Sequence, residues 1–174
     1  MTVAAAARMA LLIFVVSILQ VSAFSSMSIF GAAPDLLLVT LVAVGLLRGA
    51  IAGAIAGFAA GLIVDVATLG TLGVTSLLLT LAGFWAGRYG ETTGRGRPHA
   101  PLVAVLAATV FVDVGGYVLD SLLGGPVLMR EVLLSLPAAL VLNGLLAYPT
   151  FALIRRAVGA TERLDRAREV ELVV

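Results

Sequence analysis

The chain has 174 residues, of which 61% are hydrophobic and only 12% are charged. That charged share is about half the usual share for a soluble domain, and one soluble core of this size cannot bury so much apolar surface. The composition therefore excludes an ordinary soluble domain and predicts an integral membrane protein of one domain. Cysteine is absent, which excludes disulfides, thiolate metal sites and cysteine nucleophiles.

The apolar runs are long and do not alternate with polar residues, which favours helices over a β-barrel. Cutting the chain at charges, glycine and proline gives six apolar segments. They cover residues 9–30, 34–47, 50–66, 70–87, 101–123 and 132–154. We therefore expect an all-α, polytopic membrane protein with six transmembrane helices in residues 1–154, followed by a basic cytoplasmic tail in residues 155–174.

The first segment permits a second interpretation. Arg8, the apolar run after it and the sequence VSA at 21–23 resemble a signal peptide with its cleavage site. Met27, Ile29 and Phe30 extend the run to spanning length, which favours a retained helix. Cleavage would leave the rest of the topology unchanged.

The stretch from Pro34 to Val64 holds one charge, Arg48. It is too long for a single crossing, which takes about 20 residues. We place a tight helical hairpin at Arg48 and Gly49, the only plausible break. The second segment is then short and either spans the membrane poorly or is partly re-entrant, which is tolerable only if protein shields it.

The basic residues, all of them arginine, predict the orientation. With six crossings and both termini in the cytoplasm, every arginine except Arg130 is cytoplasmic, as the positive-inside rule requires. We expect these clusters to meet anionic lipid headgroups. The cytoplasmic set is Arg8, Arg48, Arg88, Arg95, Arg97, Arg155, Arg156, Arg163, Arg166 and Arg168.

A row of glycines runs along the third segment. Gly49, Gly53, Gly57 and Gly61 recur every four residues, and the next step reaches Asp65. Residues four apart share one helix face, and bare backbone in lipid lets another helix approach closely. Two occupants stay open: internal packing against the second, fourth or sixth segment, which we favour, or the transmembrane helix of a partner protein.

Three carboxylates, Asp35, Asp65 and Asp120, fall at the outer side in this topology. Asp35 follows Pro34, and this pair suits a helix N-terminus, so a capping role is favoured. The alternatives for the three are hydrated or capping groups at interface depth, or an acidic outer cluster that meets a partner or ligand.

Asp113 lies deeper, nearer the middle of the fifth segment, beside Gly115 and Gly116. A carboxylate at that depth is costly unless it is paired or hydrated. We expect it to be protonated or hydrogen-bonded to Asn143 or Ser135 of the sixth segment.

Signals for catalysis are weak. His99 is the single histidine and lies in an arginine-rich loop, which argues against a triad or a histidine metal site. The GRGRP sequence at 94–98 lacks the lysine and helix of a phosphate loop. We therefore predict no enzyme, catalytic residue, metal, cofactor or nucleic-acid partner.

Several short motifs resemble the rod shape-determining protein MreD family. They are Pro34 and Asp35 opening the second segment, a Gly-Phe-x-x-Gly-Leu-x-x-Asp run at 57–65, and Leu72-Gly73 leading into the next helix. Length and segment count also fit. The segments after residue 100 match by hydropathy rather than by motif, so Asp113 and Asp120 have no support from the family pattern.

The resemblance implies a multi-pass protein of the bacterial inner membrane that acts as a scaffold of the cell-elongation complex. Members bind the bitopic protein MreC and help couple MreB filaments, indirectly, to a RodA-type glycosyltransferase and a class B penicillin-binding protein in peptidoglycan synthesis. The family is also similar in fold to the substrate-binding subunits of energy-coupling-factor transporters. On this basis the MreC transmembrane helix would lie on a surface made by the glycine row, Phe58 and Asp65.

Two other functions stay open. One is a small-solute, vitamin-like binding subunit of a transporter, in which the outer acidic cluster would hold the ligand. The other is a helical membrane protein without a ligand. Aromatic residues are only 6% of the chain, and Trp85 lies at the cytoplasmic end of the fourth segment. The sequence thus lacks an aromatic outer loop for stacking a vitamin, which favours the scaffold.

Overall fold

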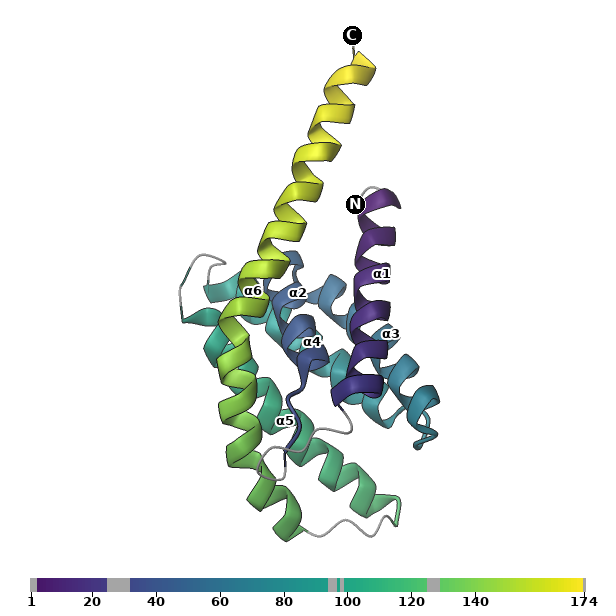
Figure 1. Cartoon of the computed structure of the whole chain (residues 1–174), viewed down its shortest axis with the longest axis vertical. Coiled ribbons are helices and arrows are strands. Elements are labelled where there is room, and N and C mark those ends of the chain that lie inside the picture. Colours follow the sequence, from purple (N-terminus) through teal and green to yellow (C-terminus); the bar gives the residue numbers. More distant parts are fainter. Residues whose placement is uncertain (1–2, 25–31, 94–96, 98, 125–128, 174) are drawn as a thin grey trace.

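The computed structural model describes residues 3–24, 32–93, 97, 99–124 and 129–173, and these ranges are helical over most of their length. Figure 1 shows the helices gathered into one bundle, from which the end of the last helix projects. The elements are α1 (Val3–Leu19) with a π-helical turn (Gln20–Phe24), α2 (Leu36–Arg48), α3 (Ala50–Thr68), α4 (Val74–Thr93), α5 (Ala100–Leu122) and α6 (Met129–Val173). Within these ranges the all-α prediction is confirmed, and each predicted segment corresponds to one of these helices; residues 25–30 of the first segment lie outside the described residues.

The predicted break between the second and third segments is also confirmed. Gly49 alone separates α2 from α3. Its φ of 95° lies in the region that glycine adopts without steric cost, and its N–H still donates to the carbonyl of Gly45 at 2.8 Å. One glycine therefore reverses the chain.

Helix α2 lies at the centre of the bundle. Every residue from Leu37 to Leu46 is buried, and the helix contacts each of the other five helices. Its 13 residues span about 20 Å, which is shorter than a hydrocarbon core of about 30 Å. The shielding that the sequence analysis required for a short second segment is present on every side of the helix.

The closest packing in the bundle joins α3 to α4. A Cβ atom built on Gly53 would overlap the backbone of Gly83, and one built on Gly83 would overlap the backbone of Gly53. The same holds for Gly57 against Leu79 and for Gly61 against Ser76. The glycine row is therefore a groove for a neighbouring helix, and α4 fills it.

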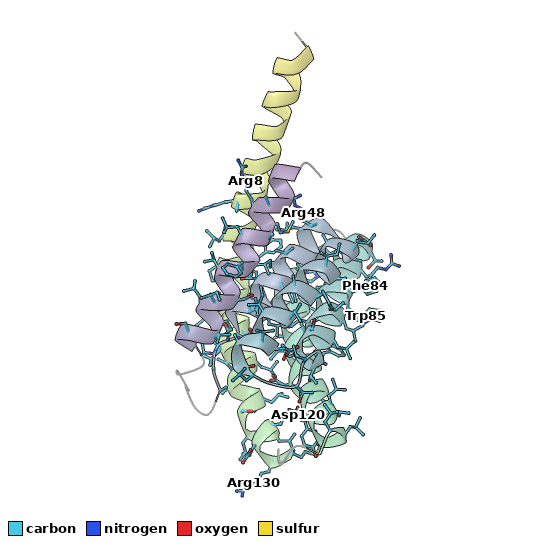
Figure 2. The ribbon with its side chains drawn as sticks, turned by 90° about the vertical axis from the view of Figure 1, so that its right-hand side faces the viewer. Arg8, Arg48, Phe84, Trp85, Asp120 and Arg130 are labelled. Atoms are coloured by element: carbon cyan, nitrogen blue, oxygen red, sulfur yellow. The ribbon has the colours of Figure 1, made fainter. Side chains whose placement is uncertain are left out.

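Both ends of the described chain lie at the same end of the molecule (Figure 1). Arg8 and Arg48 lie toward that end, whereas Asp120 and Arg130 lie toward the opposite end (Figure 2). This arrangement agrees with the predicted partition of the arginines. The predicted division between residues 154 and 155 falls inside α6, which continues to Val173 without a break.

Three helical stretches are long and apolar enough to cross a membrane: Ala50–Thr68, Ala100–Leu122 and Met129–Ala157. Shorter apolar helices cover Ala7–Ser22 and Leu36–Arg48. By length and composition alone these three are candidate membrane spans. Six crossings with both termini in the cytoplasm stay a prediction.

The contact between α3 and α4 predicts that Gly57→Leu lowers the free energy of unfolding by at least about 1–3 kcal/mol, because the new side chain must push two backbones apart. The measurement is the midpoint of SDS-induced unfolding in mixed micelles. Ala67→Leu, at an exposed position of the same helix, is the matched control. Equal midpoints for the two variants would contradict the packing.

Candidate functional site

Asp65, the residue that ends the glycine row, caps the next helix. It is 2% exposed, and its carboxylate accepts hydrogen bonds from the N–H groups of Gly73 at 2.8 Å, Thr75 at 3.2 Å and Ser76 at 3.3 Å. These groups lie at the start of α4 and have no partner within that helix. A carboxylate also interacts favourably with the positive end of the helix dipole. The row ends in an acid because α4 begins beside it.

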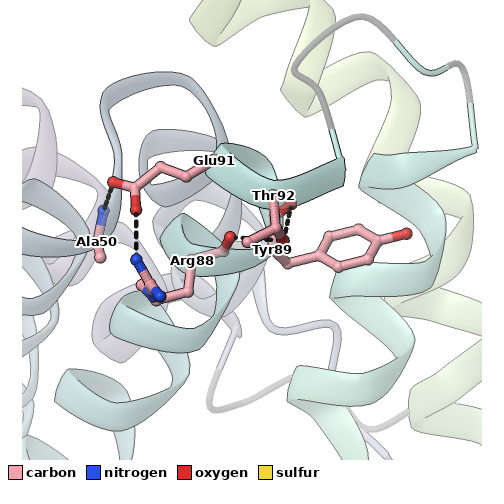
Figure 3. A network of polar contacts seen from close by, with 5 residues as sticks. All are labelled: Ala50, Arg88, Tyr89, Glu91 and Thr92. Atoms are coloured by element: carbon pink, nitrogen blue, oxygen red, sulfur yellow. Dashed lines mark hydrogen bonds and ion pairs between the residues drawn. The ribbon is translucent and has the colours of Figure 1, made fainter.

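Glu91 near the end of α4 does the same for α3. Its Oε1 accepts from the Ala50 N–H at 3.0 Å, and its Oε2 lies 3.4 Å from Nη1 of Arg88 (Figure 3). Each helix of the pair thus supplies the acid that caps the other. The sequence did not reveal Glu91, because the predicted fourth segment ends at residue 87, whereas α4 extends to Thr93.

The N-terminus of α2 is enclosed by polar side chains from two elements. Asp35 caps its own helix, as predicted, by accepting from the Leu38 N–H at 2.8 Å. The side chain of Gln20, in the π-helical turn after α1, accepts from the Leu36 N–H at 2.9 Å and donates to the Pro34 carbonyl at 3.2 Å. These bonds satisfy backbone groups that would otherwise be buried without partners.

Asn143 on α6 is buried and joins this junction to α5. Its Oδ1 accepts from the Asp35 backbone N–H at 2.8 Å, and its Nδ2 donates to Oγ1 of Thr109 at 3.1 Å. The bond from Asn143 to Asp113, one of the alternatives expected for Asp113, is not present among the described residues, where the amide bonds to Asp35 and Thr109 instead. Ser135 likewise donates to the Val132 carbonyl within its own helix, at 3.2 Å.

Two of the three carboxylates of the predicted outer acidic cluster lie at helix N-termini. The carboxylates of Asp35 and Asp65 are used on the N-termini of two different helices. Asp113 and Asp120 are half-buried along α5. Two of the three predicted members therefore act in helix capping.

Of the two occupants left open for the glycine row, the structure has the favoured one, internal packing against a helix of this chain. Gly53, Gly57 and Gly61 are covered by α4, and Gly49 is buried at the turn between α2 and α3. Phe58 is 56% exposed and is not among the buried residues of this helix. A partner can reach Phe58, but it cannot reach the row without displacing α4.

A different apolar groove, which we call the α1–α3 groove, lies between those two helices. It has a volume of about 650 Å³. Its α3 wall carries Ala52, Ala56, Ala59 and Ile63, which share one face because they are spaced by four, three and four residues. Its α1 wall includes Phe14, which is 51% exposed. Alanines predominate on the α3 wall, which also includes Ile55, and larger apolar side chains predominate on the α1 wall, so the groove is an apolar trough.

The described residues thus define a helical protein with helices of membrane-spanning length, in which acids and amides close helix ends. A family model described as rod shape-determining protein MreD matches residues 3–157. Because this match covers most of the chain, the protein belongs to the MreD family, and this links it to rod shape determination. No curated protein and no solved structure matches the chain.

The cap at α4 predicts different effects for two substitutions of Asp65. Asp65→Ala leaves buried N–H groups without an acceptor and should lower the free energy of unfolding by about 1–2 kcal/mol. Asp65→Asn keeps one oxygen acceptor and should cost less. Unfolding in mixed micelles measures both, and equal losses would contradict the capping role.

The Asn143 bonds predict energetic coupling between α5 and α6. Asn143→Leu should cost about 1–3 kcal/mol, because the Asp35 N–H loses its acceptor. Thr109→Val should cost less in the Asn143→Leu background than in the unaltered protein, because its partner is then already gone. Strictly additive costs in this double-mutant cycle would show that the two side chains do not interact.

Proposed function

We propose that this protein is a membrane scaffold of the bacterial cell-elongation complex and that it binds the bitopic protein MreC. The observation that carries the proposal is the family match over residues 3–157. The polar contacts support it, because Asp35, Asp65 and Glu91 are engaged in closing helix ends. A scaffold uses such bonds to hold its shape and offers its apolar faces to neighbours.

The α1–α3 groove is the proposed seat of the MreC transmembrane helix. Along α3 it runs from Ala52 to Ile63, about three turns or 16 Å. Alanines at Ala52, Ala56 and Ala59 let a neighbouring backbone approach closely, and packing of this kind holds helices together in lipid. Exposed Leu11 and Phe14 of α1 supply side-chain contacts on the other side of the trough.

The remaining partners follow from the place of the family in the elongation machinery. Through MreC, the scaffold supports a RodA-type glycosyltransferase and a class B penicillin-binding protein during peptidoglycan synthesis along the lateral wall. MreB filaments are coupled indirectly from the cytoplasm. The protein resides in the inner membrane with both termini in the cytoplasm, and Arg8 and Arg48 lie at the end that faces anionic headgroups.

The transporter alternative has less support. It needs free carboxylates in an outer cluster to hold a solute, and Asp35 and Asp65 instead accept hydrogen bonds from backbone groups. Asp65 is also 2% exposed, so a solute cannot reach it. We therefore retain the scaffold as the proposed function.

This seat for MreC is tested by filling the α1–α3 groove with larger side chains. Ala52→Leu combined with Ala59→Leu should reduce the MreC recovered with the tagged protein about tenfold or more, because overpacking a helix contact costs at least about 1–3 kcal/mol. The measurement is co-purification from membranes that contain both proteins.

The matched control is Ala107→Leu, at an exposed alanine on α5 outside this groove. The control should recover MreC as the unaltered protein does, and both variants should be found in the membrane fraction at equal amounts. Full recovery of MreC with the groove filled would refute this seat.

A further inference from the structure

A second groove, which we call the α4–α5 groove, lies between those two helices and has a volume of about 380 Å³. Its floor is made of the buried alanines Ala86, Ala104 and Ala108. Its lining also includes three aromatic residues, Trp85, Tyr89 and Phe111, together with Ala82, Val103 and Ala107. The groove is therefore narrow, smooth and apolar, with ring systems along its walls.

The aromatic residues of α4 lie toward one end of this groove. Trp85 is 64% exposed, and its ring meets Phe84 edge-on, with centroids 5.9 Å apart. Tyr89 is half-buried one turn further along, and Figure 3 shows its ring turned away from Arg88 and Glu91. Tryptophan and tyrosine favour the level of the lipid headgroups, so this end of the groove is suited to the membrane surface.

A positively charged residue, Arg97, lies at the same end of the α4–α5 groove. Arg97 is exposed in the segment that joins α4 to α5, and its carbonyl accepts from the Ala100 N–H at 3.2 Å, which fixes its backbone at the start of α5. Arg88 is already paired with Glu91. Among the described residues of this junction, Arg97 is thus the cation whose charge is available to a ligand.

The size of the groove favours an acyl chain over a protein helix. The α4 wall runs from Ala82 to Tyr89, which is about 10 Å or two turns. A transmembrane helix is about 10–12 Å across with its side chains and would contact only that short stretch. A flexible hydrocarbon chain fills such a trough.

We propose that the α4–α5 groove binds an anionic phospholipid of the inner leaflet. One acyl chain lies along the alanine floor between Trp85 and Phe111, and the phosphate pairs with Arg97. Charge complementarity selects the anionic headgroup, because a zwitterionic headgroup brings no net charge to the arginine. The orientation rests on the proposed function, which places the α4–α5 junction at the cytoplasmic surface.

The single tryptophan of the chain lines this groove, so quenching of its fluorescence reports lipid in contact with this face of the protein. The purified full-length protein is placed in phosphatidylcholine vesicles that contain increasing fractions of a lipid with brominated acyl chains. Bromine quenches tryptophan on contact. Brominated phosphatidylglycerol should reach half-maximal quenching at about a fivefold lower fraction than brominated phosphatidylcholine, the effect of one arginine at an anionic surface.

Two variants separate the headgroup from the chain. Arg97→Gln should remove the fivefold preference while leaving the maximal quenching unchanged. Ala107→Phe, which narrows the groove from an exposed position, should lower quenching by both lipids. Equal quenching by the two lipids in the unaltered protein would overturn the proposal, as would a preference that survives Arg97→Gln.

This outcome is independent of MreC. Ala52→Leu with Ala59→Leu alters the other groove and should leave the quenching of Trp85 unchanged, whereas Ala107→Phe should leave MreC recovery unchanged. A failed co-purification test with intact lipid preference would reject the scaffold contact alone. A lost lipid preference with intact MreC recovery would reject only the lipid site.

Discussion

Backbone contact between α3 and α4 is the constraint on which the rest of the structure depends. Gly53 and Gly83 meet at a distance that no side chain permits, and Gly57 and Gly61 continue the contact toward the start of α4. In a bilayer, apolar side chains gain no hydrophobic energy by exchanging lipid contacts for contacts with another helix. Close backbone approach instead supplies the dispersion energy of helix association. The central helix α2 uses the same device, since a Cβ atom on Gly45 would lie 2.8 Å from the Gly83 carbonyl oxygen. The absence of side chains at these glycines thus allows α2, α3 and α4 to pack against one another.

The few polar groups follow a common rule. Asp65 caps α4, Glu91 caps α3, and Asp35 with Gln20 and Asn143 closes the start of α2. Each satisfies backbone N–H groups that have no partner within their own helix. Leaving such groups without a hydrogen bond is costly where water is scarce. Because these acids are engaged in helix capping, the apolar faces are the surfaces that remain for contacts with other molecules. The α1–α3 groove, which we propose for a protein helix, and the α4–α5 groove, which we propose for a lipid, are two such faces.

The sequence predicted those features that depend on neighbouring residues. The break at Gly49, the short shielded second segment and the cap at Asp35 follow from spacing, length and local turn chemistry, and the structure confirms them. The row of glycines also predicted close packing correctly. Which helix fills the row could not be read, because spacing fixes one face and says nothing of the partner. The two hydrogen bonds of Asn143, to Thr109 and to the Asp35 backbone, could not be predicted for a similar reason. They depend on how three helices are rotated and at what depth they cross. Glu91 was missed because the end of α4 was placed several residues too early.

The reciprocal caps of α3 and α4 also bear on the order in which the protein is assembled. Consecutive helices that carry each other's caps and fit by backbone contact form a local unit, and local contacts form faster than distant ones. Helix α2 is synthesised first, yet at 13 residues it is too short to cross a bilayer comfortably by itself. Its buried surface exists only against the later helices. We therefore infer that the α3–α4 hairpin forms early and provides the surface against which α2 packs. A helix too short to span lipid alone is in this way enclosed at the centre of the fold.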